Sequence, residues 1–316
     1  MHTLRRFKAT VLGHDTSVDS IKAQLGQGGI PITEADCRSC SDPCEEGHEP
    51  YPGRFDVDME TQMLGSVKPY HRQVLSPHIS TTCIQSASTP IPPPPSSDKP
   101  LVPISGVFTP SDSSKLAILN GSHHSLSDNP DVDTILVFPD YKIISEVPRS
   151  LEGAQAFWNY LSTPDSEKGA GTLKSWVIPY SCVILLCSHK RRDNRCSIAA
   201  AKLGHAFTHS LEHSGWTVDT EIEHPTQESP GPEDLQQLAT QKKALLLRNS
   251  HTGGHKFAGN CIIYTPQGSG IWYGRVTTHE VDAIVSQTIE KGLILPPLLR
   301  GGINIARPGC KSLHDW

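Results

Sequence analysis

Two short segments of the sequence carry residue types that could bind a metal. The first, "CSHKRRDNRC", places Cys187 and Cys196 at the two ends of a polar loop. The second, "SHTGGHKF", places His251 and His255 four residues apart, with two glycines in the gap. Each glycine costs roughly 1 kcal/mol against alanine inside a helix, so this histidine pair is predicted to lie on a loop.

The donor atoms of these four residues are compatible with two kinds of metal centre. Thiolates and imidazoles bind both zinc and iron–sulfur clusters. Cysteines of structural zinc sites are usually roughly two to four residues apart, whereas eight residues separate Cys187 from Cys196. The wider loop suits a two-iron cluster, and Gly253 and Gly254 would let the backbone approach its sulfides without a Cβ clash. The residues alone leave zinc and iron–sulfur both open.

The second half of the chain is patterned in a way that predicts the elements carrying these loops. A buried strand is expected to end at Cys187, and a helix whose dipole favours a thiolate is expected to begin near Cys196. The full expected order is strand (175–187), helix (196–215), strand (216–224), helix (233–243), strand (244–251), two strands (260–276) and helix (279–292). This order is thioredoxin-like, with a mixed sheet and helices on both faces.

The first half ends with a similar pattern of two strands at 133–147 and a helix at 150–161. We therefore expect an α/β protein of two related thioredoxin-like domains. The expected division is a flexible N-terminus at 1–30 (with a short helix near 17–25), a domain at 31–165, a second domain at 174–300 and a tail at 301–316. Residues 76–110 are rich in Pro and Ser and are expected to form a flexible insert within the first domain.

The composition of the 316-residue chain bears on its binding partners and its location in the cell. A net charge of −5 gives no reason to expect nucleic acid or an anionic membrane as a partner. No apolar run reaches the roughly 20 residues of a membrane helix, and no secretory signal is visible at the start. The nine cysteines are then expected as reduced thiols or metal ligands. The expected location is cytoplasmic, with the mitochondrion as the alternative because the first residues are basic.

Longer motifs resemble those of a known family. "LLCSHKRRDNRC", "SHTGGHKFAGNCIIY" and "WYGRV" resemble the signatures of the sucrase/ferredoxin-like family, of the fungal actin-patch-distribution type, and "CEEGHEPYP" with "DMETQMLGSVKPYHRQV" resembles its N-terminal half. The resemblance implies a first domain without a cluster and a second, thioredoxin-like ferredoxin domain carrying one 2Fe–2S cluster. It implies that Cys187 and Cys196 bind one iron and that His251 and His255 bind the other.

The function that this resemblance implies is electron transfer to a redox partner that the sequence does not identify. Two neutral imidazoles in place of two thiolates predict a higher potential than that of four-thiolate ferredoxins, and they predict coupling to pH. An electron carrier is expected rather than an enzyme with its own small-molecule substrate. Three alternatives stay open: a redox or iron sensor, a structural zinc protein, and a thiol oxidoreductase using Cys37, Cys40 and Cys44. With His48, the same three cysteines are also a candidate zinc-binding set.

Other histidines and the C-terminus complete the expectations. His189 is expected beside the cluster without binding it, and His123 and His124 are expected in solvent. The chain ends in "SLHDW", where Asp315 and Trp316 resemble the tail that some apoproteins present to the cytosolic iron–sulfur assembly targeting complex. That pattern prefers an aliphatic residue at the place that His314 occupies.

Overall fold

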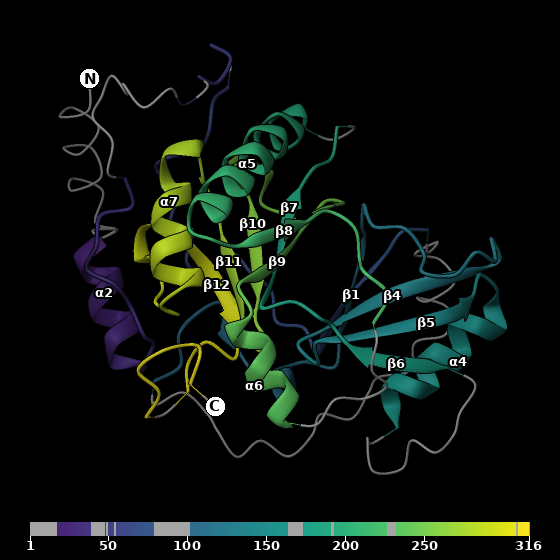
Figure 1. Ribbon diagram of the computed structural model, residues 1–316. Helices are drawn as coiled ribbons and strands as arrows, with labels where there is room; N and C mark the ends of the chain where they lie inside the picture. The colour runs from purple at the N-terminus through teal and green to yellow at the C-terminus, as the bar shows by residue number, and fades with distance from the viewer. Residues whose placement is uncertain are drawn as a thin grey trace.

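The computed structural model describes residues 18–38, 48, 50–53, 55–78, 102–163, 173–190, 193–225, 232–307 and 309–315 (Figure 1). Of the residues singled out above, Cys40, Cys44 and Trp316 lie outside these ranges, as does most of the expected insert. No helix among the described residues is both long enough and apolar enough to cross a membrane.

A five-stranded mixed sheet occupies one side of the molecule, in the order β3-β1-β4-β5-β6. Its strands are β1 (Arg72–Ser76), β3 (Leu116–Asn120), β4 (Val132–Phe138), β5 (Lys142–Pro148) and β6 (Lys174–Val177). Helix α4 (Leu151–Ser162) begins where the Ser150 hydroxyl accepts a hydrogen bond from the Gly153 N–H. The strand pair and the helix expected in this region are confirmed.

A seven-stranded mixed sheet occupies the other side, in the order β2-β12-β11-β10-β7-β9-β8. Its strands are β2 (Val107–Phe108), β7 (Cys182–Cys187), β8 (Thr217–Asp219), β9 (Lys243–Asn249), β10 (Cys261–Tyr264), β11 (Gly270–Tyr273) and β12 (Leu299–Ile303). Its helices are α5 (Asn194–His213), α6 (Pro232–Thr240) and α7 (Val281–Ala283), which continues as a π-helix at Ile284–Ile289. The expected order of elements from strand to final helix is confirmed.

The two sheets pack on each other, and this arrangement corrects the expectation of helices on both faces. One buried cluster combines Leu136 and Phe138 of β4 with Val183 and Leu185 of β7, so it fills the space between the sheets. The outer face of the larger sheet packs against α5 and α7, and the outer face of the smaller sheet packs against α4 (Figure 1). Strands such as β7, buried along their whole length, are apolar throughout because each of their faces is covered.

The termini of the expected domains also differ from the structure. Helix α2 (Val18–Gln27) confirms the short helix expected near 17–25, but its Leu25 is fully buried in the core of the larger sheet, whereas 1–30 was expected to be flexible. Strands reach into both ends of the expected insert at 76–110. Ser76 is the last residue of β1, and Val107–Phe108 form β2. Strand β6 begins at the expected start of the second domain but pairs with β5 of the smaller sheet. Burial of apolar residues in shared cores explains these differences.

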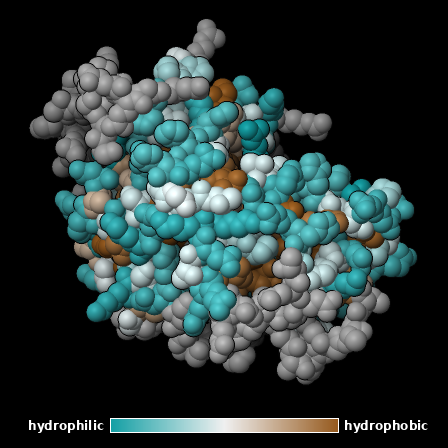
Figure 2. Space-filling view, in the orientation of Figure 1, coloured by the Kyte–Doolittle hydropathy of each residue, from teal (hydrophilic) through white to brown (hydrophobic). Residues whose placement is uncertain are grey.

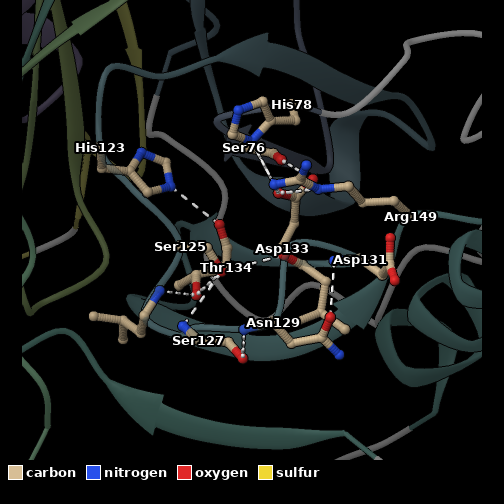
Figure 3. Close-up of polar contacts among 12 residues, drawn as sticks. Ser76, His78, His123, Ser125, Ser127, Asn129, Asp131, Asp133, Thr134 and Arg149 are labelled. Atoms are coloured by element: carbon tan, nitrogen blue, oxygen red, sulfur yellow. Dashed lines mark hydrogen bonds and ion pairs between the residues drawn. The ribbon is translucent and has the colours of Figure 1, made fainter.

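Hydrogen bonds join the segment that follows β3 to strand β4 and to the end of β9. Figure 3 shows His123 beside Thr134, to whose carbonyl oxygen the ring Nε2 donates at 3.0 Å. Only 1% of His123 is exposed, so the expectation that it is solvated is wrong, whereas His124 is exposed. The turn before His123 is paired with the end of β9, since the Ser122 N–H donates to the Arg248 carbonyl oxygen at 2.9 Å. The smaller sheet thereby fixes the start of the histidine loop.

The face of the molecule drawn in Figure 2 is mainly hydrophilic where it is described, and apolar side chains appear there as small separate areas. Across the described residues, the large apolar side chains that are exposed come from distant parts of the sequence: Val18, Met59, Val102 and Leu151. Isolated exposed apolar residues of this kind are normal and need no partner.

Candidate metal centre

Parallel pairing of two strands brings the first cysteine and the first histidine to one edge of the larger sheet. Strands β7 and β9 are adjacent and parallel, with Cys187 opposite Asn249. Both chains therefore leave the sheet at the same end, and His251 follows two residues after β9. The backbone of Ser250 is held by Asn120 of the smaller sheet, to whose carbonyl oxygen its N–H donates at 2.8 Å.

The second cysteine reaches the same place through the start of helix α5. Asp193 caps this helix by accepting a hydrogen bond from the Arg195 N–H, and Cys196 lies in the first turn. Cys187 and Cys196 are 3% and 0% exposed and pack in one buried cluster with Ala258. The two thiols interact closely enough that each shifts the pKa of the other.

Both glycines of the histidine loop adopt a backbone conformation that favours glycine. Gly253 and Gly254 have φ of 81° and 67°, in the left-handed region that glycine adopts without strain. Gly254 precedes a short 3-10 helix, His255–Phe257, and His255 at its first position is exposed. The ring centroids of His251 and His255 are 5.7 Å apart. The pair therefore lies on a tight loop, as its spacing predicted.

A further histidine lies closer to the first cysteine than the sequence indicated. The Nδ1 atom of His189 is 3.4 Å from the Sγ atom of Cys187. The His189 and His251 rings meet edge to face with centroids 4.3 Å apart. Donor atoms of Cys187, His189 and His251 all lie within 4.8 Å of one another, which makes this the only such group of three among the described residues. The structure therefore adds His189 to the candidate donors near Cys187 and His251.

The two thiols do not titrate alike. A hydrogen bond from Cys196 lowers the pKa of Cys187, and groups of Thr252 and His189 lower it further against the opposing effect of burial. The pKa of Cys196 is raised, because its proton is held by Cys187 and because burial disfavours its thiolate. A metal or a cluster that binds both sulfurs as thiolates displaces the protons that they carry.

A buried cation beneath the histidine loop was not expected from the sequence. Arg300, in β12, is 2% exposed. It donates from Nη1 to the Oδ1 atom of Asn260 at 2.7 Å and to the carbonyl oxygen of Gly253 at 3.3 Å. Burial lowers its pKa to about 10, and the charges of Cys187 and Cys196 oppose that change. Its only sequence signal is a charge inside an otherwise apolar run, "LILPPLLRGGINI".

A strap from the first half of the chain covers the cysteine pair. We use the term strap for residues 55–61. Phe55 and Val57 pack on the buried cluster that contains both cysteines. Two contacts of Asp58 hold the strap in place. Its carboxylate forms an ion pair with Lys256 at 3.2 Å, and its carbonyl oxygen accepts a hydrogen bond from Arg275 Nε at 2.6 Å. Arg275, which lies in the motif "WYGRV", therefore holds the strap over the site.

The remaining candidate residues lie away from this centre or outside the described chain. Cys37 is half-buried against the core of the larger sheet, and burial raises the pKa of its thiol to about 12. Such a thiol is a poor nucleophile. The side chain of Asp315 accepts from the Lys311 and Ser312 N–H groups, while Leu313 is buried in the same core. The tail is therefore anchored immediately before Trp316, whose own placement is outside the described residues.

The donor set fits a 2Fe–2S cluster or a single zinc ion. The buried thiol pair, the two imidazoles of the loop and the open backbone at Gly253, where a Cβ would meet no atom within 4 Å, provide donors and space. Thiolate and imidazole are the protein ligands of both kinds of centre.

The chain is similar to one protein family and to several curated proteins. The sequence pattern of the family described as sucrase/ferredoxin-like matches residues 59–301. The "Altered inheritance of mitochondria protein 32" of Clavispora lusitaniae is 32% identical over 119 residues, and that of Debaryomyces hansenii is 34% identical over 124 residues. The "Actin patches distal protein 1" of Saccharomyces cerevisiae is 34% identical over 107 residues. These alignments cover 34% to 38% of this chain and 29% to 36% of the relative, so the chain matches about a third of each relative. No solved structure matches this one.

Proposed function

The chain belongs to the sucrase/ferredoxin-like family, and from this premise we propose that it transfers electrons through one 2Fe–2S cluster. Cys187 and Cys196 hold one iron, and His251 and His255 hold the other. The observation that carries the proposal is the meeting of a buried thiol pair and a histidine loop at one edge of one sheet. A bound cluster would supply the one-electron chemistry.

The surrounding residues have roles that suit this chemistry. Phe55 and Val57 of the strap cover the cysteines and limit the access of water. The Arg300 guanidinium places a buried positive charge near both thiolates and so stabilises an added electron. Neutral imidazoles leave the centre less negative than four thiolates would, which raises the potential in the same direction. A histidine nitrogen that carries an exchangeable proton would couple reduction to pH.

We also propose that the larger sheet is a thioredoxin-like ferredoxin domain. Support comes from the order β11-β10-β7-β9, in which β7 and β9 are parallel and β10 and β11 are antiparallel to their neighbours. The crossover between β7 and β9 and the helix after β11 complete the thioredoxin-like order. For the smaller sheet, the pair β4-β5 followed by α4 supports the same assignment in part.

The proposed location is the cytoplasm, with the mitochondrion as the alternative, and the redox partner is a protein still to be identified. Two of the relatives described above are named for mitochondrial inheritance. We propose that the cytosolic iron–sulfur assembly targeting complex recognises Trp316 together with Asp315. Deletion of Trp316 should lower the cluster content of protein isolated from cells and leave its thermal unfolding unchanged. Equal cluster content would reject that recognition.

The ligand set is tested by single substitutions in protein reconstituted without oxygen. Cys187→Ser, Cys196→Ser, His251→Ala and His255→Ala should each remove most of the visible absorption of the cluster. Cys310→Ser is the matched control, because Cys310 is a free, half-exposed thiol in the C-terminal tail. Full cluster content in any of the four variants would show that the substituted residue is not a ligand.

A further inference from the structure

His189 is the donor nearest to Cys187 and belongs to neither pair of proposed cluster ligands. It follows β7 by two residues, and its Nδ1 atom faces the Cys187 Sγ atom at 3.4 Å. The edge of one ring meets the face of the other where His189 contacts His251. His255 does not belong to the compact group of donors, and neither does Cys196. The tightest set of donors in the site is therefore different from the set that suits a two-iron cluster.

We propose that Cys187, His189 and His251 form a site for a single zinc ion, at the same place as the proposed cluster. Zinc bonds of about 2.3 Å to sulfur and about 2.0 Å to nitrogen, in tetrahedral geometry, place sulfur and nitrogen about 3.6 Å apart. The observed separation of 3.4 Å is close to that value. The limit of 4.8 Å among all three donor atoms leaves only a small closure to bring the third donor onto the ion.

The surroundings favour one thiolate and two imidazoles on a single ion. Cys187 belongs to the compact group and Cys196 lies outside it, so one sulfur and two imidazole nitrogens are the donors that converge. Three protein ligands leave a fourth tetrahedral position for water, as in catalytic zinc sites. The carbonyl oxygen of Ser250 lies 3.8 Å from the Cys187 sulfur, so the loop that carries His251 passes directly beside the site.

Zinc and the proposed cluster exclude each other, because both would use Cys187 and His251. This exclusion rests on the proposed function, whereas the zinc site itself does not. A chain loaded with zinc could not accept a cluster until the ion had left. The choice of histidine, His189 for zinc or His255 for the cluster, would then distinguish two metal-bound forms of one protein.

The experiment measures zinc affinity in the reduced full-length apoprotein, by calorimetry and by competition with a chromophoric chelator. Cobalt(II) serves as the spectroscopic probe, because a thiolate ligand produces a sulfur-to-metal charge-transfer band. Wild-type protein should bind one ion and show that band. His189→Gln should weaken zinc binding by at least about tenfold, whereas His255→Gln should change it by less than about threefold. His189→Cys, which restores a donor at the same position, should recover binding and distinguish loss of a ligand from loss of the fold.

Three results would overturn the zinc site. They are equal affinity in wild type and His189→Gln, a larger loss in His255→Gln than in His189→Gln, and failure of His189→Cys to recover binding. The cluster proposal is judged on other evidence, namely the iron content and colour of the wild-type protein. A wild-type protein that never takes up iron but shows the predicted zinc pattern would reject the proposed function and leave the zinc site standing.

Discussion

A Cβ atom on Gly254 would lie 2.4 Å from the Nη2 atom of Arg300. The guanidinium cannot easily move aside, because it is buried and donates to Asn260 and to the Gly253 carbonyl oxygen. The second glycine of the histidine loop is therefore required both by its backbone conformation and by the cation beneath it. This contact links the loop that presents His251 and His255 to the buried charge of the site.

Substitution of the two glycines should separate these requirements. Gly253→Ala has only the left-handed backbone to accommodate, since a Cβ there meets no atom within 4 Å, and it should cost roughly 1 to 2 kcal/mol. Gly254→Ala should cost roughly 1 to 3 kcal/mol more, because the methyl group meets the guanidinium. Urea unfolding of the apoproteins measures both values. Equal destabilisation would show that the guanidinium yields without cost.

Arg300→Met should lower the reduction potential of the cluster. Removing a buried positive charge leaves the added electron less stabilised, so the shift is negative and on the order of tens of millivolts. Arg300→Lys keeps the charge and should shift the potential less. Arg149→Met is the control, since Arg149 forms an ion pair with Asp133 of the smaller sheet, away from the site. An unchanged potential in Arg300→Met, with the cluster intact, would show that this charge does not act on the cluster.

The potential of the wild-type protein should fall as pH rises. A histidine ligand that takes up a proton on reduction makes reduction easier at low pH and harder at high pH. Potentiometric titrations from about pH 6 to about pH 10 measure the slope. Replacing His255 with cysteine should flatten it, if a cluster still forms. A wild-type potential that does not change over this range would exclude proton coupling through the histidines.

Stability of the apoprotein should fall in mild acid because of His123. Burial lowers the pKa of this imidazole, and the nearby Glu221 and Asp133 carboxylates only partly oppose the change, while His124 adds to it. The unfolded chain then binds a proton below about pH 6.5 that the folded chain does not, so stability is lost as pH falls through this value. Thermal unfolding of wild type and His123→Gln at pH 7 and pH 5.5 tests this. The wild type should lose more stability than the variant, and parallel losses would contradict the assignment.

Much of the fold follows from local sequence pattern. The helical stripe of Ala199, Leu203, Phe207 and Leu211 predicts α5, and all four side chains are buried in one core. The apolar run before Cys187 predicts the buried strand β7. Packing of the two sheets could not be predicted in the same way. A continuous apolar strand shows that both faces are covered, and it does not show whether a helix or another sheet covers them.

The candidate site, like the fold, could be predicted from the sequence only in part. Residue type and spacing are sufficient to indicate Cys187, Cys196, His251 and His255 as a group of donors. Arg300 and the strap could not be found from sequence, because their contacts with the site join residues far apart in the chain. His189 is visible in the sequence as a nearby histidine, but only the turn of the backbone after β7 places its ring against the Cys187 sulfur. Local patterns identify donors, and tertiary structure decides which of them meet.

The most direct test of the central claim is the visible and electron-spin spectrum of the full-length protein isolated without oxygen, with iron and sulfide measured on the same sample. We expect a red-brown protein with about two iron atoms and two sulfides per chain and a spin signal that appears on reduction by one electron. A folded, colourless protein without iron or sulfide, even after reconstitution, would contradict it.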